Sequence, residues 1–362
     1  MSHRRPFCFA SLLVSAAALL APGIALACGA FYASAIEVSP NQKIIVTHRE
    51  GVETYVFRPH FCGAAKDFGV ILPIPSALTA NPVLGKSELF DQLDDFSAPR
   101  EECQPKESVG IGCGSDADKG VDLAAQFPEE KPQVNVVDRG RVGAFEWALL
   151  QAVTVNAFTD WLDQNGFPHD SASQAIYQSY VDKQWYFVAF KVSADASAPP
   201  EGMKLCGDLG PIQLSFTAAS PVVPSRIASL NQSGTRPTWR VYLVAGQQQR
   251  VSDQSGYGSY YSSPYFAQTL VEGDLSSRPA LAEMAREGER VTVLTVSLPT
   301  AGASDDLYFA ADSYGYDYRS TKYKDCDAGR GCSAGGMMPT GAWGATLVLL
   351  FLASMRRRRR GA

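Results

Sequence analysis

Histidines are the first residues of this chain to consider for catalysis, and outside its first 27 residues they are His48, His60 and His169. A nucleophilic site needs a nucleophile, a base and an orienting carboxylate within hydrogen-bond reach. The chain has no HExxH helix or P-loop on which such a site could be built, and its GxSxG string, at residues 331–335, lies directly before the apolar segment near the C-terminus. We therefore expect a cross-strand role for His48, a loop position for His60 and a capping or solvated role for His169.

Cysteines are the second set of reactive residues. Six of the eight are disulfide candidates: Cys28, Cys62, Cys103, Cys113, Cys206 and Cys326. An even number in an oxidising compartment predicts up to three disulfides, whose pairing the sequence does not fix. Cys103 and Cys113 flank a short loop, so we favour a local bridge there. His60 lies near Cys62, but no CxxC pair or second histidine cluster completes a tetrahedral site, and we expect neither a metal nor another cofactor.

The first 27 residues have the order of a secretory signal peptide. Arg4 and Arg5 precede an apolar stretch over residues 7–20, and the small-residue triplet at 25–27 stands directly before Cys28. We expect cleavage after this triplet and export of the remainder. Lipidation of Cys28 at the new N-terminus is an alternative that the sequence leaves open.

A second membrane signal occupies residues 332–362. Residues 337–355 are uncharged and mostly apolar, close to the roughly 20 residues that a transmembrane helix needs. A cluster of arginines follows, which is typical of the cytoplasmic side: Arg356, Arg357, Arg358, Arg359 and Arg360.

Cys332, the glycine-bearing apolar segment and the terminal arginines together resemble the MYXO-CTERM sorting tail of myxobacteria. The resemblance covers about the last thirty residues. It implies insertion into the inner membrane, handling by export and sorting machinery, cleavage near Cys332 and transfer to the cell surface with a lipid on that cysteine. A permanent single-span anchor is the alternative.

The charge of the chain between its two terminal signals, which we call the body, excludes one class of partner. The chain has a formal charge of −5, and the seven arginines of the two ends leave the remainder at −12. Nucleic acids need a basic surface to neutralise their phosphates. We therefore expect no nucleic-acid partner and a well-solvated exported domain.

Between the two ends, strand and helix patterns alternate without a regular βαβ rhythm, which predicts the α+β class. We expect a mixed or mainly antiparallel sheet, a few packed helices, bracing disulfides and the C-terminal transmembrane helix. The expected strands lie within 36–74, at 185–192 in the middle of a sheet, and at 212–216, 240–244 and 291–298. The expected helices start at caps Ser87, Asn156 and Ser171, and Gly166 ends the second.

Several segments occur in an order that resembles the bacterial domain of unknown function number 2330, over roughly residues 28–244. They are CGAFY, FGVILPIP, LFDQL, VGAFEWALL, WLDQNGF, YVDKQWYFVAFKV and GPIQLSF. The resemblance implies no activity, cofactor or catalytic residue. We expect the exported domain to span 28–300, followed by a linker over 301–331 and the tail over 332–362.

Tyrosine is concentrated late in the chain, where residues 255–266 and 308–323 hold nine of the fifteen, interleaved with Gly, Ser and Asp. This composition suits an adaptable contact surface for a glycan or protein ligand, although a flexible hairpin and linker would also have it. Our main hypothesis is a surface-displayed, non-enzymatic binding or structural module. The alternative is a secreted hydrolase that pairs His169 with Asp160 or Asp170.

Overall fold

The computed structural model describes thirteen stretches of the chain. They are residues 30–32, 37–38, 42–58, 60–63, 69–104, 134–167, 169–192, 205–208, 210–231, 238–255, 261–298, 303–313 and 315–325. The chain divides into a main unit, residues 1–99 with 124–320, and a small unit, residues 100–123 with 321–362.

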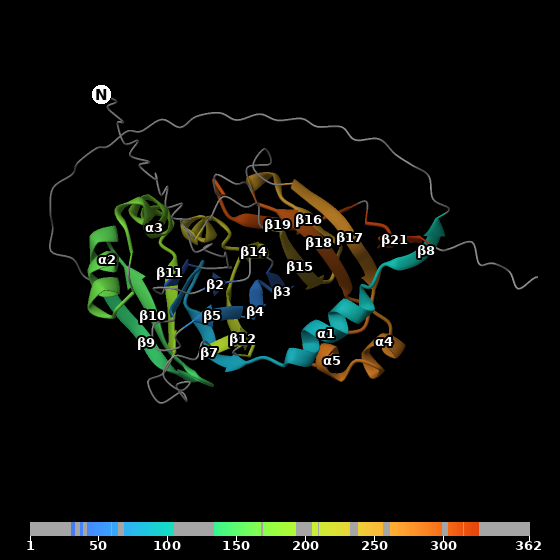
Figure 1. Ribbon diagram of the computed structural model, residues 1–362, viewed down its shortest axis with the longest axis horizontal. Coiled ribbons are helices and arrows are strands. Elements are labelled where there is room, and N and C mark those ends of the chain that lie inside the picture. Colours follow the sequence, from blue (N-terminus) through green and yellow to red (C-terminus); the bar gives the residue numbers. More distant parts are fainter. Residues whose placement is uncertain are drawn as a thin grey trace, which may run out of the picture. The chain divides into compact units, whose positions relative to one another are not determined.

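An eight-stranded sheet is the largest element of the main unit (Figure 1). Its strands, in spatial order, are β20 (Tyr318–Arg319), β17 (Tyr261–Thr269), β18 (Arg290–Ser297), β15 (Thr238–Ala245), β3 (Lys43–Arg49), β4 (Val52–Phe57), β13 (Ile212–Thr217) and β7 (Leu78–Leu84). Neighbours run antiparallel, except that β15 and β3 are parallel. The β3–β4 turn is made by Glu50 and Gly51, both at positive φ, which suits the tight hairpin that these residues predict.

A second sheet of the main unit has five antiparallel strands. In order they are β1 (Ala30–Tyr32), β6 (Gly69–Ile74), β11 (Tyr186–Val192), β10 (Phe145–Ala152) and β9 (Val134–Val142). The expected strand at 185–192 is therefore confirmed in the sheet interior. β6 includes Pro73 and ends at Ile74, and β1 pairs with it only as far as Ile71, so the proline lies where β6 has no β1 partner.

Two three-stranded sheets complete the main unit. One is β12 (Leu205–Asp208), β5 (His60–Gly63) and β2 (Glu37–Val38), and the other is β14 (Val222–Val223), β19 (Leu307–Ala311) and β16 (Gln249–Val251). Residues 303–320, which we expected within a linker, thus contribute β19 and β20 to the main unit. The small unit pairs β8 (Arg100–Gln104) with β21 (Thr321–Asp325) in parallel.

Both faces of the eight-stranded sheet are buried. Phe57 of β4 lies 6.0 Å from Phe190 of β11 between ring centroids, so one face packs against the five-stranded sheet. The other face packs Val56 and Tyr242 against helices α1 (Ser87–Phe96) and α5 (Pro279–Met284), beside the short α4 (Glu272–Ser276). Each fully buried large apolar side chain contributes about 1.5–3 kcal/mol, so this double burial holds the unit together.

Helices α2 (Val155–Gln164) and α3 (Gln174–Asp182) cover the opposite face of the five-stranded sheet (Figure 1). The Phe158 ring of α2 stacks on Phe187 of β11 with centroids 4.0 Å apart. Tyr180 of α3 meets the same ring edge-on at 6.1 Å. This contact fixes both helices over one end of β10 and β11.

The predicted helices exist, but their N-caps lie elsewhere. Thr154, not Asn156, caps α2, because its hydroxyl accepts the Ala157 N–H at 3.2 Å. Lys86 takes the cap position that we gave to Ser87 and makes no side-chain cap bond. A 3-10 turn at Ser171–Ser173 leads into α3, and its cap is Asp170. A cap needs extended backbone before the first turn, and Thr154 and Asp170 have it.

The fold class is α+β with mainly antiparallel sheets. Strands at 212–216, 240–244 and 291–298 are confirmed as β13, β15 and β18. In the described part of the chain, no helix is long and apolar enough to cross a bilayer. The expected signal at 1–27 and the transmembrane segment at 337–355 lie outside the described residues.

Candidate functional site

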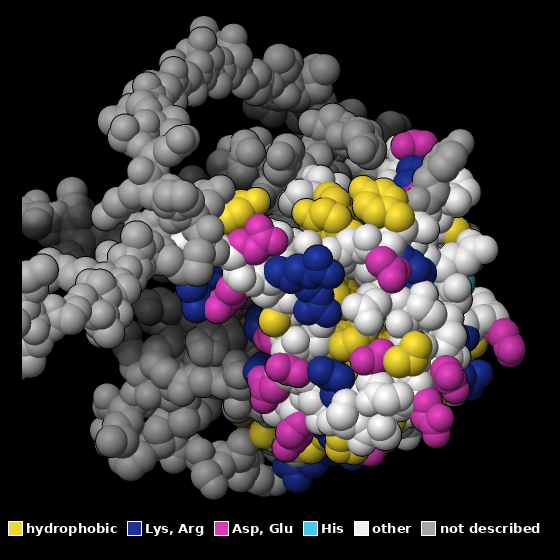
Figure 2. All heavy atoms as spheres, turned by 90° about the vertical axis from the view of Figure 1, so that its right-hand side faces the viewer, with side chains coloured by type: hydrophobic (Ala, Val, Ile, Leu, Met, Phe, Trp, Pro, Cys, Tyr) yellow, Lys and Arg dark blue, Asp and Glu magenta, His cyan; other side chains and the backbone are white. Residues whose placement is uncertain are grey.

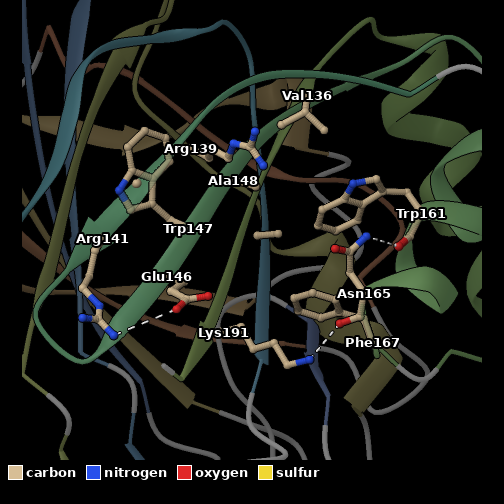
Figure 3. Close-up of a pocket in the computed structure, with 12 residues that line it drawn as sticks. Val136, Arg139, Arg141, Glu146, Trp147, Ala148, Trp161, Asn165, Phe167 and Lys191 are labelled. Carbon is tan, nitrogen blue, oxygen red and sulfur yellow. Dashed lines mark hydrogen bonds and ion pairs between the residues drawn. The ribbon is translucent and has the colours of Figure 1, made fainter. Parts of the chain in front are cut away.

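A groove on the five-stranded sheet is the candidate site. Helix α2 covers one end of β10 and β11, and among the described residues none covers the other end, which has a hollow of about 690 Å³ above it (Figure 3). Ala148 of β10 and Ala189 of β11 lie opposite each other in the sheet register and form the floor. Their short side chains leave the space that larger residues would fill. We call this hollow the cationic groove; its lining residues are Val136, Arg139, Gly140, Arg141, Glu146, Trp147, Ala148, Trp161, Asn165, Phe167, Ala189 and Lys191.

An aromatic wall closes one side of the groove. Trp161 near the end of α2 stacks on Phe167 with centroids 5.8 Å apart and an interplanar angle of 27°. Phe167 is buried over Gly69 of β6, where a Cβ would lie 2.5 Å from the phenyl ring. Gly166, at φ +71°, turns the chain after α2 and sends Phe167 back to the sheet. The buried Phe167 therefore supports one face of the Trp161 ring, which remains partly exposed.

Lys191 stands at the foot of this wall. Its ammonium group donates to the carbonyl oxygen of Asn165 at 2.8 Å and lies 5.8 Å from the Phe167 ring centroid. A cation is favourable there because the last carbonyl groups of a helix carry partial negative charge. Lys191 thus stabilises the end of α2 and adds positive charge to the groove.

Two arginines of the edge strand β9 form the opposite side. Arg141 lies 4.0 Å from Glu146, a pair in which both side chains are at least half exposed. Arg139 lies opposite Ala148 in the register. Among the residues that the structure describes, the Arg139 guanidinium has no side-chain partner, and it is exposed. Figure 3 shows it above the groove floor.

The described lining of the groove is basic, although the chain as a whole is acidic. It has three basic side chains and one acidic one, an excess of two positive charges on a chain of net charge −5. Figure 2 shows another face of the molecule, the right-hand side of Figure 1, on which acidic and basic side chains are interspersed. A guanidinium without a protein partner binds carboxylate, sulfate or phosphate well, because its N–H groups match two oxygens at once.

The lining favours binding over catalysis. Arginine stays protonated and does not act as a base at neutral pH, and the single carboxylate of the described lining, Glu146, pairs with Arg141. An acid–base mechanism needs groups that can give up and accept protons near neutral pH. What the described side chains can do is hold an anionic ligand against an aromatic wall.

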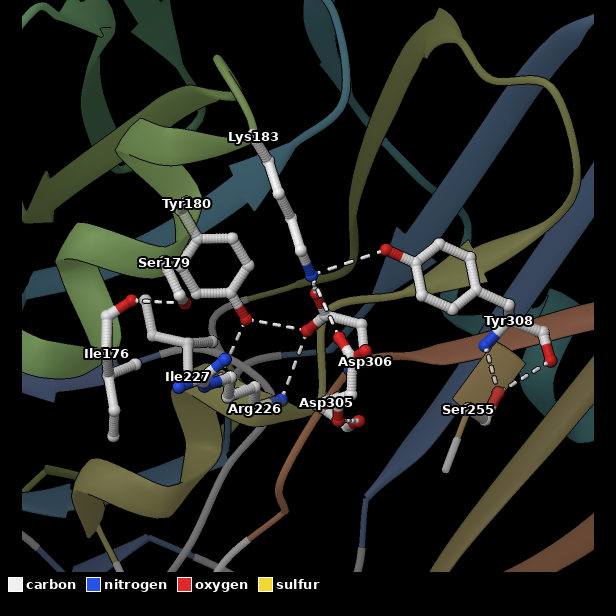
Figure 4. Close-up of polar contacts among 11 residues, drawn as sticks. Ile176, Ser179, Tyr180, Lys183, Arg226, Ile227, Ser255, Asp305, Asp306 and Tyr308 are labelled. Atoms are coloured by element: carbon white, nitrogen blue, oxygen red, sulfur yellow. Dashed lines mark hydrogen bonds and ion pairs between the residues drawn. The ribbon is translucent and has the colours of Figure 1, made fainter. Parts of the chain in front are cut away.

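A buried polar cluster lies outside the groove (Figure 4). The Asp306 carboxylate is fully buried and accepts from the Tyr180 hydroxyl at 2.6 Å, the Lys183 ammonium at 3.0 Å and the Arg226 N–H at 3.2 Å. Burial alone would lower the pKa of Lys183, but the charge of Asp306 and the hydrogen bonds to Asp305 and Asp306 together outweigh it and raise the pKa. Because both carboxylate oxygens are occupied, this cluster joins α3 to β19 and is structural.

A smaller pocket joins the two tyrosine-rich segments. It has a volume of about 200 Å³. Phe266 of β17 comes from the first segment, and Tyr316 and Tyr318 come from the second. Tyr316 is 63 % exposed. The structure therefore brings the two segments together, and ligand binding at them stays a prediction.

The histidines do not form the expected hydrolase pairs. His169 Nε2 lies 3.1 Å from Asp163 Oδ1, outside hydrogen-bond alignment. Asp170 instead accepts the Ser173 N–H, and Asp160 is exposed on α2. His48, on β3 as expected, contacts the Ala218 carbonyl oxygen at 2.9 Å.

His60 belongs to strand β5, where we expected a loop. The pairing of β5 with β2 and β12 puts this residue in the ladder.

The cysteines are placed only in part. Cys62 of β5 stands directly opposite Cys206 of β12 in the backbone register. Cys103 lies in β8. The remaining candidates lie outside the described residues, as do the tail positions: Cys28, Cys113, Cys326, Cys332 and Arg356 to Arg360. Within the described stretches, no group of three His, Cys, Asp or Glu residues could hold a metal ion.

The sequence pattern does not indicate the groove. Residues 134–142 form β9, which carries Arg139 and Arg141, and this strand is not among those expected from the sequence. Seven of its nine residues are exposed, so it lacks the alternating apolar pattern of a half-buried strand. The stretch VNVV, rich in β-branched residues, was the signal that could have indicated a strand.

Residues 22–310 match the model of a family described as "Uncharacterized protein conserved in bacteria (DUF2330)". No curated protein matches the chain. Among solved structures, baculovirus P35 is 10 % identical over 76 % of this chain and 97 % of that one, with a TM-score of 0.32. P35 in complex with caspase-8 is 6 % identical over 74 % and 92 %, also at 0.32. Similarity at this level carries no argument about fold or function.

Proposed function

The chain belongs to the DUF2330 family of bacterial proteins, and we propose that it is an exported binding protein of the cell envelope whose ligand site is the cationic groove. The proposal concerns recognition and display, without a chemical step. The groove would face outward from the cell and hold a ligand from the envelope or the surroundings.

The groove supports this proposal through one combination: a hollow of about 690 Å³ in which the Arg139 guanidinium, without a side-chain partner among the described residues, faces an aromatic wall. This volume lies within the roughly 300–1,000 Å³ typical of small-molecule sites. A preformed site binds more tightly because little side-chain freedom is lost on binding.

The two ends of the chain support the cellular part of the proposal. The arginines, apolar stretch and small residues of positions 1–27 suit export, and residues 332–362 suit anchoring by a helix or by a lipid on Cys332. The proposed partners are the membrane, the export and sorting machinery, and a glycan or protein ligand outside.

Blocking the groove tests the binding function. The mature protein, recovered from the envelope, is labelled and incubated with the envelope fraction of the producing cells. Ala148→Trp would fill the floor and should lower retention at least tenfold, whereas Ala282→Trp, at an exposed position of α5, should leave it unchanged. Circular dichroism checks that both variants fold. Equal retention of wild type and Ala148→Trp would remove the groove from the function.

Intact-mass analysis of the envelope protein tests the location. A wild-type product that ends near Cys332 with added lipid mass, absent from Cys332→Ala, is expected. A product that keeps Arg356 to Arg360 would instead identify a permanent membrane anchor. Recovery of the protein only from the cytoplasm would contradict export.

A further inference from the structure

We infer that the ligand of the cationic groove is an anionic carbohydrate whose charges are carboxylates, such as a short uronate-containing segment of a glycan. This inference rests on the proposed binding function and names the chemical class of its ligand.

Arg139 selects the charged group. Arg141 is already near Glu146, and Lys191 is bonded to the end of α2, so Arg139 is the basic lining residue without a side-chain partner in the described structure. One planar guanidinium matches one planar carboxylate in a two-point contact. A phosphate group carries more charge and is typically held by several cations or backbone N–H groups. A single free guanidinium therefore favours a carboxylate.

Trp161 selects a ligand with an apolar face. Its ring is partly exposed and is held in place by the stack on Phe167. A pyranose ring has an axial C–H face that buries apolar area on an indole ring, while its hydroxyl groups stay in water or bind polar neighbours. A rigid aromatic platform beside a carboxylate-binding arginine is the arrangement that a sugar acid needs.

Polar groups at the rim suit hydroxyls. The side-chain NH₂ group of Asn165 donates to the Trp161 carbonyl oxygen at 2.8 Å. The side-chain carbonyl oxygen of Asn165 can then accept a hydrogen bond from a ligand hydroxyl. The short side chains of Ala148 and Ala189 let a ring approach the sheet closely. The volume of the groove suits a few sugar units and is too small to hold a large globular partner.

The acidic body argues for widely spaced charges on the ligand. A chain of formal charge −5 repels a dense polyanion at long range, and one free cation does not offset this. Uronate residues carry one charge per sugar, which a local guanidinium can bind within a Debye length of about 8 Å.

A peptide strand added to the edge of β9 is the competing occupant, since Val136 and Val137 are 41 % and 43 % exposed there. Arg139 and Trp161, however, act at the face of the sheet, which favours the sugar.

Calorimetric titration of the mature envelope protein tests the inference. The probes are a tri-uronate, the matching neutral trisaccharide, a sulfated trisaccharide and inorganic phosphate. We expect the tri-uronate to bind at least tenfold more tightly than the others. Arg139→Ala should weaken it at least tenfold and Arg139→Lys by less, since lysine keeps the charge without the planar fork. Arg286→Ala, at an exposed position outside the groove lining, should change nothing.

Trp161→Tyr gives a second measurement that does not depend on charge. It keeps a ring over Phe167 and should weaken the tri-uronate severalfold. Equal binding of the neutral and acidic sugars, stronger binding of phosphate or sulfate, or an unchanged affinity in Arg139→Ala would each overturn the inference. If Ala148→Trp abolishes envelope retention while the tri-uronate fails to bind, the ligand class is wrong and the proposed function stands. If the tri-uronate fails to bind and Ala148→Trp leaves envelope retention unchanged, both the ligand class and the proposed function are contradicted.

Discussion

Glu53 and Asp306 are two carboxylic acids without exposed surface, and their surroundings differ. Asp306 receives three hydrogen bonds, one from an ammonium group. Glu53 receives one, from the Val222 N–H at 2.9 Å, and its other oxygen has no hydrogen-bond partner among the residues that the structure describes. Burial without a cation raises the pKa of Glu53 well above its usual range. The fold therefore buries one carboxylate that is paired with a cation, Asp306, and one carboxylic acid that keeps its proton to higher pH, Glu53.

Glu53→Gln should stabilise the protein at neutral pH and leave it little changed in acid. The unfolded chain loses this proton near pH 4.3, whereas the folded protein keeps it to higher pH, so the free energy of unfolding falls as pH rises through that interval. The amide cannot ionise and removes this loss, which amounts to about 1.4 kcal/mol per pH unit between the two pKa values. Urea unfolding at pH 4 and pH 7 measures it. A difference between variant and wild type that is the same at both pH values would contradict the raised pKa.

Lys183→Met should destabilise the protein by about 3 kcal/mol, because it leaves the Asp306 charge buried without its cation. Chemical denaturation at pH 7 measures the free energy of unfolding. Lys86→Met is the matched control, since the Lys86–Glu283 pair is more than half exposed and should contribute less than about 1 kcal/mol. Similar losses in both variants would mean that Asp306 does not depend on Lys183.

At the scale of elements, the sequence predicts the helices and strands whose apolar residues recur in a regular local pattern. The apolar stripe of α1 and the β-branched runs of β13, β15 and β18 could be recognised because their burial repeats along the chain. β9 could not, because its order comes from pairing with β10 across the Gly143 turn. Caps were misplaced by one or two residues, since several neighbouring residues had suitable side chains and only the backbone decides among them.

The groove was beyond prediction for a related reason. Its floor depends on the register that brings Ala148 opposite Ala189 and Arg139 opposite Ala148, in a ladder that shifts at Leu149. Trp161 belongs to an expected helix, yet its exposure depends on where α2 ends over the sheet. Long-range register of this kind leaves no mark in a single sequence.

Gly69→Ala tests how α2 and the sheet shape the aromatic wall. The new methyl group would lie 2.5 Å from the Phe167 ring, which is buried and cannot swing into solvent. We expect a loss of about 1–3 kcal/mol from overpacking, together with weaker ligand binding as Trp161 moves with Phe167. Thermal unfolding and titration measure the two effects. Gly246→Ala, which meets no atom within 4 Å, is the control, and equal behaviour of the two variants would show that the wall does not rest on Gly69.

At the scale of the whole molecule, export and covalent bracing are linked expectations. The backbone register already brings two of the six candidate cysteines together, Cys62 opposite Cys206. Cα atoms of an antiparallel pair are about 4.5–5.5 Å apart, within the roughly 4.4–6.8 Å that a disulfide spans. The local bridge between Cys103 and Cys113 stays a prediction, because Cys113 lies outside the described residues.

We predict a disulfide between Cys62 and Cys206 in the mature protein. In the oxidising compartment that export implies, the two thiols would pass two protons and two electrons to its thiol-oxidising machinery and close a long loop of the chain. Peptide mapping without reductant should find the two cysteines in one linked fragment. The double variant Cys62→Ser/Cys206→Ser should lose roughly 2–5 kcal/mol of stability, and reduced wild type should lose a similar amount. Free thiols at both positions would show either that the protein matures in a reducing compartment or that the register does not lead to a bond. The Cys103 fragment in the same map separates these outcomes, because a bridge there would require an oxidising compartment.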